Sequence, residues 1–98
     1  MHNFFVYILK CSGGLYYTGH TDNLEKRLSE HKQGLCKGFT SKRLPVKLVF
    51  AQMFNTRDAA FRAERKIKKW SKMKKEALIG GDWGAVSILG RKSFKVER

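Results

Sequence analysis

Five side chains in this sequence have the types and spacing needed to hydrolyse a phosphodiester. Two tyrosines stand ten residues apart in VYILKCSGGLYYTGHT, an arginine and a histidine follow four residues apart, and a glutamate comes later in a basic stretch; they are Tyr7, Tyr17, Arg27, His31 and Glu64. A carboxylate can hold a divalent metal that polarises the phosphate, and an arginine can stabilise the added charge of the transition state. A phenol or an imidazole can relay the proton of the attacking water. Such a reaction requires all five groups to meet at one phosphate.

Glu64 has an unusual place in its helix for a carboxylate. It lies four residues after Ala60 and three before Ile67, at the edge of the apolar stripe and away from the solvated back of the helix. Burial of an unpaired carboxylate is costly, so this group should bind a cation. The cation is either an arginine, which is the commoner arrangement, or a metal ion.

The other four side chains each have an ordinary structural explanation as well. The rings of Tyr7 and Tyr17 can fill core while their hydroxyls bind backbone carbonyls, and Arg27 and His31 can lie on the surface of an exposed helix. The five residues together are more informative than each alone. They come from two strands and two helices, and we expect all of them to point toward one side of a small three-stranded sheet, a side ringed by lysines.

The two tyrosines lie in a predicted hairpin whose loop length decides whether they share a face. Residues 3–11 and 15–21 are rich in β-favouring side chains and are joined by Ser-Gly-Gly. A two-residue turn would place Tyr7 and Tyr17 on opposite faces. A three-residue loop, with a glycine in the left-handed conformation, would set Leu9 opposite Tyr17 and Tyr7 diagonally beside it. We prefer the three-residue loop because only this register brings both phenols to one pocket.

A first helix is predicted in DNLEKRLSEHKQG. Thr21 or Asp22 can cap its start, Leu24 and Leu28 form its buried stripe, and Gly34 ends it. Arginine and histidine at a spacing of four then share a neighbouring face of this helix.

The rest of the fold is predicted to be one more strand and two helices. Residues 46–54 form a third strand, long and apolar enough to pair centrally with the hairpin. A helix over residues 56–70 starts at the cap Thr56 and packs its apolar stripe on the sheet, and a shorter helix covers residues 72–79. The fold class is therefore α+β, a small three-stranded antiparallel sheet flanked by helices.

Size and charge limit the classes of function. A chain of 98 residues has room for one domain, and 42% apolar residues are enough for a compact core. The formal net charge of +13 favours a polyanionic partner, and nucleic acid fits better than a membrane because no segment approaches the length of a span. A basic face that only aids solubility is the alternative explanation of this charge.

Cys11 and Cys36 are expected to be free thiols, and the absence of a secretory signal at the start of the sequence favours a reducing cytoplasm.

The order of several short motifs resembles the GIY-YIG nuclease superfamily, in particular its small stand-alone, UPF0213-like members. These motifs are VYIL, YTG ten residues later, RLSEH, FTSKRLPVKLVF and AERKIKKWSKMKKEALI, and the similarity covers about residues 3 to 80. The resemblance implies an antiparallel sheet flanked by helices and metal-dependent cleavage of DNA. Six positions match the family's motif residues: Tyr7, Tyr17, Gly19, Arg27, His31 and Glu64.

The resemblance also implies a role for each matched side chain. Tyr7 or Tyr17 would assist the nucleophilic water, Arg27 would contact the phosphate and His31 would support proton transfer. Glu64 would hold one divalent cation, Mg²⁺ or Mn²⁺, and no small-molecule cofactor is implied.

The sequence departs from the family pattern at three places. Phe5-Val6 replaces the Gly-Ile of the first motif, and Thr18 replaces the isoleucine of the second. Many active members carry an asparagine on the C-terminal side of the glutamate, whereas this sequence has none after Asn55.

We therefore expect a DNA endonuclease that is weakly sequence-specific or structure-selective, with a role in DNA repair or recombination. The alternative is a non-catalytic nucleic-acid-binding module, for DNA or RNA, that retains the fold. Substrate capture would depend on a basic face made of Arg57, Arg62, Arg65, Lys66, Lys68, Lys69, Lys72, Lys74 and Lys75.

The nuclease-like domain is expected over residues 1–82. A basic, partly flexible tail would follow over residues 83–98, with Trp83 as an anchor and the last eight residues frayed.

Overall fold

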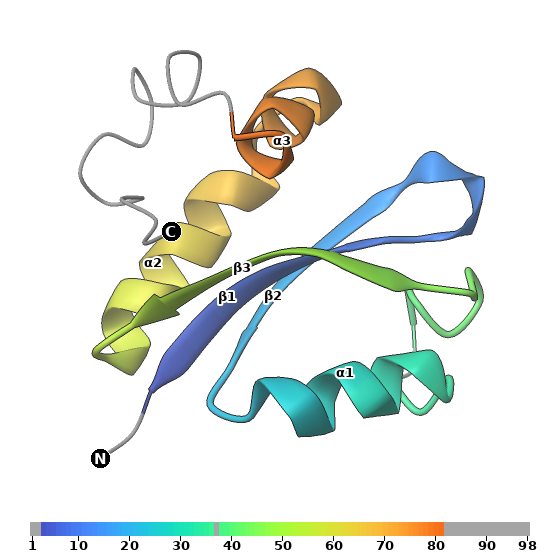
Figure 1. The fold of residues 1–98 in the computed structure, drawn as a ribbon, viewed down its shortest axis with the longest axis horizontal. Helices are drawn as coiled ribbons and strands as arrows, with labels where there is room; N and C mark the ends of the chain where they lie inside the picture. Colours follow the sequence, from blue (N-terminus) through green and yellow to red (C-terminus); the bar gives the residue numbers. More distant parts are fainter. Residues whose placement is uncertain (1–2, 37, 82–98) are drawn as a thin grey trace.

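The computed structural model describes residues 3–36 and 38–81, which form a three-stranded antiparallel sheet between helices (Figure 1). The elements follow in the order β1 (Phe4–Lys10), β2 (Tyr16–Thr21), α1 (Leu24–Lys32), β3 (Lys47–Phe54), α2 (Arg57–Lys68) and α3 (Lys72–Ile79). A short 3₁₀ turn, Ser12–Gly14, joins the first two strands. The predicted fold class is confirmed.

The hairpin adopts the register of the three-residue loop. Leu9 pairs with Tyr17, and Gly13 and Gly14 take positive φ angles of 86° and 79° in the turn, a conformation that glycine adopts without steric cost. Because successive side chains of a strand alternate between faces, Tyr7 and Tyr17 point to the same side of the sheet. This prediction is confirmed.

Helices cover both faces of the sheet, so the core has two parts. On one face, Tyr7 and Leu9 pack with Leu24 and Leu28 of α1. On the other face, Val6 and Ile8 lie in a cluster with α2 and α3, whose buried apolar members are Ala60, Ala63, Ile67 and Leu78. Figure 1 shows α1 on one side of the sheet and α2 with α3 on the other. Groups of α2 that pack against β1 are thus separated by the sheet from groups on α1.

The residues that cap and end α1 are the predicted ones with one exception. The cap of α1 is Asn23, whose side chain accepts a hydrogen bond from the Lys26 backbone N–H, so the assignment of Thr21 or Asp22 was wrong. The Thr21 hydroxyl instead accepts from the Asn23 backbone N–H at 3.1 Å and holds the cap in place. Gly34, with φ of 76°, follows the end of α1 as predicted.

The later elements also lie close to their predicted positions. Thr56 caps α2 by accepting from the Ala59 N–H, and α3 has the predicted bounds. The third strand begins at Lys47 and pairs with β1, but the strand order β2-β1-β3 makes β1 the central strand and β3 an edge. The central position expected for the third strand was therefore wrong.

Several expectations concern residues that the structure does not describe. The tail over residues 83–98, its anchor Trp83 and the end of the domain at residue 82 lie outside the described residues. Within residues 3–36 and 38–81, no helix has the length and apolar content to cross a membrane. Cys11 and Cys36 are free, as expected.

Candidate active site

Two tyrosines and a histidine form an aromatic cluster between the sheet and α1. The ring centroids of Tyr7 and Tyr17 are 6.2 Å apart, and the His31 ring lies 5.7 Å from Tyr7 and 5.1 Å from Tyr17. Tyr7 and His31 are each 1% exposed. The sequence prediction that these three side chains meet is confirmed.

Gly19 makes room for this cluster. A Cβ built on Gly19 would lie 2.6 Å from the Tyr7 hydroxyl oxygen and 3.1 Å from a ring carbon of Tyr17. Gly19 faces Tyr7 across the β1-β2 ladder. The glycine of the second motif therefore leaves the space that the phenol occupies.

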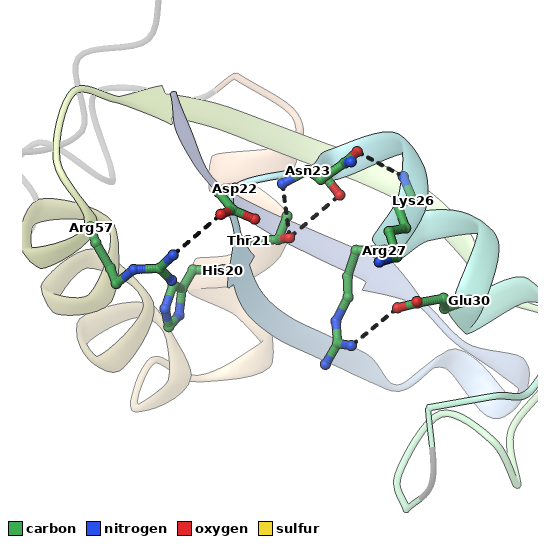
Figure 2. Close-up of a pocket in the computed structure, with 8 residues that line it drawn as sticks. All are labelled: His20, Thr21, Asp22, Asn23, Lys26, Arg27, Glu30 and Arg57. Atoms are coloured by element: carbon green, nitrogen blue, oxygen red, sulfur yellow. Dashed lines mark hydrogen bonds and ion pairs between the residues drawn. The ribbon is translucent and has the colours of Figure 1, made fainter. Parts of the chain in front are cut away.

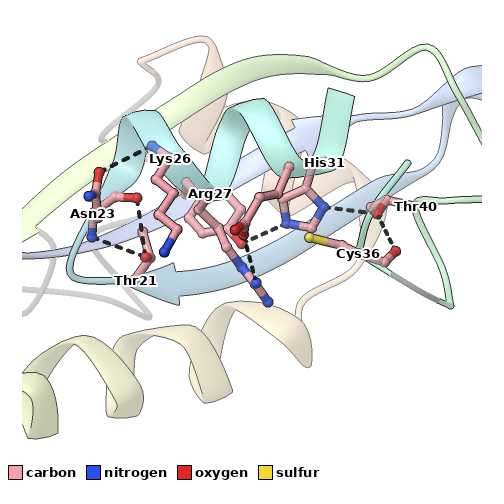
Figure 3. Close-up of polar contacts among 9 residues, drawn as sticks. Thr21, Asn23, Lys26, Arg27, His31, Cys36 and Thr40 are labelled. Atoms are coloured by element: carbon pink, nitrogen blue, oxygen red, sulfur yellow. Dashed lines mark hydrogen bonds and ion pairs between the residues drawn. The ribbon is translucent and has the colours of Figure 1, made fainter. Parts of the chain in front are cut away.

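The Tyr7 hydroxyl is the polar centre of the cluster. Its oxygen lies 2.9 Å from His31 Nε2. His31 Nδ1 lies 2.8 Å from the Thr40 hydroxyl, a contact that can be followed in Figure 3. Burial raises the pKa of the Tyr7 phenol above its usual value, with a further rise from Tyr17 and an opposing effect of Arg27. Burial, followed by the Arg27 charge, lowers the pKa of His31. At neutral pH the phenol thus keeps its proton and the imidazole is uncharged.

Arg27 connects this cluster to solvent. Its guanidinium interacts with the Tyr7 hydroxyl and forms an ion pair with Glu30 at 3.2 Å. A guanidinium here can bind a phosphate oxygen while keeping its contact with the phenol, because it carries five N–H donors.

A pocket of about 380 Å³ opens beside Arg27 (Figure 2). It lies between the start of α1, the end of β2 and the start of α2, and is lined by His20, Thr21, Asp22, Asn23, Lys26, Arg27, Glu30 and Arg57. Four of these side chains are basic or can become cationic, and two are acidic. The pocket is therefore polar and can accept an anionic group.

The fifth predicted residue lies on the other side of the sheet. Glu64 is 7% exposed and belongs to α2, which packs on the face of Val6 and Ile8 and not on the face of Tyr7. The prediction that all five side chains point to one side was wrong for Glu64. The side-chain periodicity of β1 explains this, because neighbouring residues of one strand face opposite helices.

Two cationic or polar partners satisfy the Glu64 carboxylate. One oxygen is hydrogen-bonded to His20 Nδ1 and the other lies 2.6 Å from Lys68 Nζ. The prediction of a buried carboxylate with a cationic partner is confirmed. The two partners considered from the sequence were an arginine and a metal ion, and the partner present is Lys68. Because His20 belongs to the edge strand β2, its contact with Glu64 places the carboxylate near this edge of the sheet.

His20 links the two sides of the sheet. It lines the pocket together with Arg27, and it contacts Glu64 through Nδ1 and the Phe61 ring edge-on at 5.7 Å. Because β2 is an edge strand, α1 and α2 both reach past it toward this pocket. His20 was not among the predicted site residues, although its place directly after the second motif was a usable signal.

The predicted basic face lies on α2 and α3. Of its nine residues all are exposed except the half-buried Lys75, whose pKa is lowered by burial and by Lys68. Ion pairs join Arg57 to Asp22, Arg62 to Asp58 and Lys68 to Glu64. The sequence analysis expected basic residues around the phenols. These nine residues lie instead on the Glu64 side of the sheet.

The residues present are compatible with a single divalent cation at Glu64. Among the described residues, no group of three or more His, Cys, Asp and Glu side chains could hold a metal. Mg²⁺ commonly binds one or two carboxylates and completes its shell with water and substrate phosphate. The Glu64 carboxylate can serve as such a ligand if the Lys68 side chain, half exposed, moves away from it.

Comparison with known proteins identifies the family. The family model for the GIY-YIG catalytic domain matches residues 3–77. The chain belongs to the GIY-YIG family. The family supports a nuclease-type function and implies a nucleic acid as substrate. GIY-YIG nucleases generally depend on a divalent metal.

The GIY-YIG chain is also similar to small proteins of the UPF0213 group. It is 40% identical over 80 residues to a UPF0213 protein of Natronomonas pharaonis, covering 82% of this chain and 94% of the relative. It is 40% identical over 78 residues to the UPF0213 protein YazA of Bacillus subtilis, covering 80% and 79%. The solution structure of a UPF0213 protein of Bacillus halodurans matches with a TM-score of 0.53 and 36% identity, over 89% of this chain and 96% of the other. A solution structure of an E. faecalis protein gives a TM-score of 0.57 and 32% identity, over 84% and 91%.

Proposed function

We propose that this GIY-YIG protein is a DNA endonuclease that hydrolyses phosphodiester bonds with one divalent cation, Mg²⁺ or Mn²⁺. The observation that carries the proposal is the pocket at the β2 edge. Arg27, in contact with Tyr7, lies on one wall, and His20, in contact with Glu64, lies on another. A phosphate in this pocket would be within reach of groups from both sides of the sheet.

The side chains of α1 and β1 supply proton transfer and charge stabilisation. Arg27 binds a non-bridging phosphate oxygen and offsets the charge that grows in the transition state. The Tyr7 phenol takes the proton of the attacking water as its own proton passes to His31 Nε2. Tyr17 packs against both rings and fixes their orientation.

Glu64 is the residue that would hold the cation. When bound, the cation supplies positive charge and Lewis acidity at the phosphate. His20 orients the carboxylate through its hydrogen bond, and Lys68 neutralises it before the cation binds.

DNA capture rests on the basic face of α2 and α3. Contacts from lysine and arginine to phosphates do not depend on base sequence, so we expect weak sequence specificity or selection by DNA structure. A role in DNA repair or recombination is consistent with such selectivity. The free thiols Cys11 and Cys36 suit a reducing, cytoplasmic compartment.

A second candidate function is nucleic-acid binding without cleavage. It is favoured by the absence of an asparagine after Asn55 and by the single carboxylate at the metal position. This protein would show tight, salt-sensitive binding to DNA or RNA and no metal-dependent products.

The test is cleavage of labelled single-stranded, branched and duplex DNA by the purified protein with Mn²⁺ or Mg²⁺, and then with a chelator. We expect products that require the cation and disappear in Glu64→Gln. The matched control is Glu25→Gln, since Glu25 is an exposed glutamate of α1 outside the pocket lining. Binding without cation-dependent products supports the second candidate, and cleavage that survives Glu64→Gln unchanged contradicts the role of Glu64.

A further inference from the structure

We infer that Thr40 is a positioning residue that holds His31 in the tautomer able to accept the proton of Tyr7. The inference rests on the proposed function, in which His31 receives this proton. Thr40 lies in the segment between α1 and β3, within the FTSKRLPVKLVF motif. It is not one of the six matched positions, and it does not line the pocket. Hydrogen bonds form a chain from Tyr7 through His31 to Thr40. Figure 3 shows the contacts that join His31 to Thr40 and Thr40 to Cys36.

The direction of the hydrogen bonds follows from the number of protons at Thr40. The Thr40 hydroxyl has one proton and is placed to donate it to the Cys36 backbone carbonyl at 3.5 Å. A carbonyl oxygen can only accept. Toward His31 Nδ1, at 2.8 Å, the Thr40 oxygen is then left as the acceptor. With the hydroxyl proton on the Cys36 carbonyl, the hydrogen of this contact is the one on Nδ1.

The other end of the chain agrees with this assignment. A neutral imidazole protonated on Nδ1 has a bare Nε2, which accepts the O–H of Tyr7 at 2.9 Å. The Tyr7 oxygen in turn interacts with the Arg27 guanidinium, which can only donate. The phenol proton consequently has one direction left, toward His31.

The burial of the chain makes the tautomer dependent on Thr40. Tyr7, His31 and Thr40 are 1%, 1% and 2% exposed, so bulk water has little access to exchange the hydrogen bonds. The charged or titratable groups that face His31 are Arg27 and Glu30 of α1 together with the two tyrosines of the sheet. None of these groups forms a hydrogen bond with Nδ1, whereas Thr40 does.

The proton transfer itself is balanced within this group. The O–H bond of the attacking water breaks as the Tyr7 oxygen takes its proton, the Tyr7 O–H bond breaks, and an N–H bond forms at His31 Nε2. The imidazolium that results keeps its Nδ1–H on the Thr40 oxygen. Thr40 neither gains nor loses a proton.

The decisive experiment is ¹⁵N NMR of the histidine side chains in the full chain, with His31 assigned by comparison with His31→Gln. We expect the wild type and Thr40→Ser to show Nδ1 protonated and Nε2 bare at neutral pH. Thr40→Val removes the acceptor at nearly constant shape, and we expect His31 to shift toward the tautomer with the hydrogen on Nε2. A wild-type His31 protonated on Nε2, or an unchanged tautomer in Thr40→Val, overturns the inference.

Kinetics give a second readout that packing alone would not produce. For Thr40→Val we expect kcat to fall by about 10- to 100-fold with little change in KM, because Thr40 orients the imidazole and touches no phosphate. Thr40→Ser should restore kcat. If the wild type does not cleave DNA, the proposed function fails, yet the tautomer measurement on wild type still decides the inference. If Thr40→Val fails to fold, the wild-type spectrum alone still decides the inference.

Discussion

Gly19 lies directly against the Tyr7 phenol, and a Cβ at Gly19 would approach the hydroxyl oxygen to 2.6 Å. A glycine is thus needed at this position of the second motif because a larger residue would clash with the tyrosine of the first motif. Both belong to neighbouring strands of the hairpin, in which they pair directly. The two motifs are therefore one packing unit, and the position of the phenol depends on the absence of a side chain opposite it.

Replacement of Gly19 by alanine should displace Tyr7 and destabilise the fold. We expect Gly19→Ala to lower the free energy of unfolding by about 1 to 3 kcal/mol, as for other overpacked sites, and to reduce cleavage. Denaturant unfolding measures the first effect. In a double-mutant cycle with Tyr7→Ala, the combined destabilisation should be smaller than the sum of the two single effects. Full stability and activity in Gly19→Ala would show that the phenol does not need this space.

Thr18 offers a test in the stabilising direction. Its side chain is 2% exposed, and its hydroxyl oxygen has no hydrogen-bond partner among residues 3–36 and 38–81. An unpaired buried hydroxyl is unfavourable, so Thr18→Val should raise the free energy of unfolding by about 1 kcal/mol without changing cleavage. Thermal and urea unfolding would detect the change. A decrease in stability would mean that the hydroxyl has a favourable contact.

His31 should make the stability of the fold depend on pH. Its pKa in the folded state is lowered by burial and by Arg27, so between that value and the ordinary value of about 6.5 the unfolded chain binds more protons. The free energy of unfolding should therefore fall as the pH drops below about 6.5. Urea unfolding at about pH 7.5 and about pH 5 should show a larger drop in wild type than in His31→Gln. Equal drops would contradict a neutral, buried His31.

The basic face should control affinity through salt. Lys69→Gln combined with Lys72→Gln removes two exposed cations and should weaken binding to DNA of any sequence. The slope of log affinity against log salt should become shallower by about 1 for each phosphate that the variant no longer neutralises. Lys42→Gln with Lys47→Gln is the matched control, with exposed lysines before and at the start of β3. Equal effects of both pairs would show that net charge alone governs binding.

Local features of the fold were predictable from the sequence. The Ser-Gly-Gly linker limited the hairpin to two registers, and the requirement that both phenols share a pocket selected the one that places Tyr7 beside Tyr17. The spacing of Ala60, Ala63 and Ile67 identified the buried stripe next to Glu64. These features depend on short-range geometry, namely turn length and helical periodicity.

The relation between distant elements was harder to predict. The side of the sheet that α2 covers does not follow from its own periodicity, and so Glu64 was placed on the wrong face. Thr40 and His20 were missed for a similar reason. Thr40 lies in a segment without periodicity, and its contact with His31 depends on the path of that segment. His20 gains its role only through α2, 44 residues away in sequence.

The most direct measurement of the nuclease mechanism is the cleavage rate of Tyr7→Phe beside that of Tyr16→Phe. Each variant removes one hydroxyl from the hairpin, but the Tyr7 hydroxyl contacts His31 whereas the Tyr16 hydroxyl donates to Glu76 of α3 at 3.1 Å. With both variants folded, we predict a decrease of about 100-fold or more for Tyr7→Phe and a near wild-type rate for Tyr16→Phe. Equal rates in the two variants would contradict the assignment of Tyr7 to proton transfer.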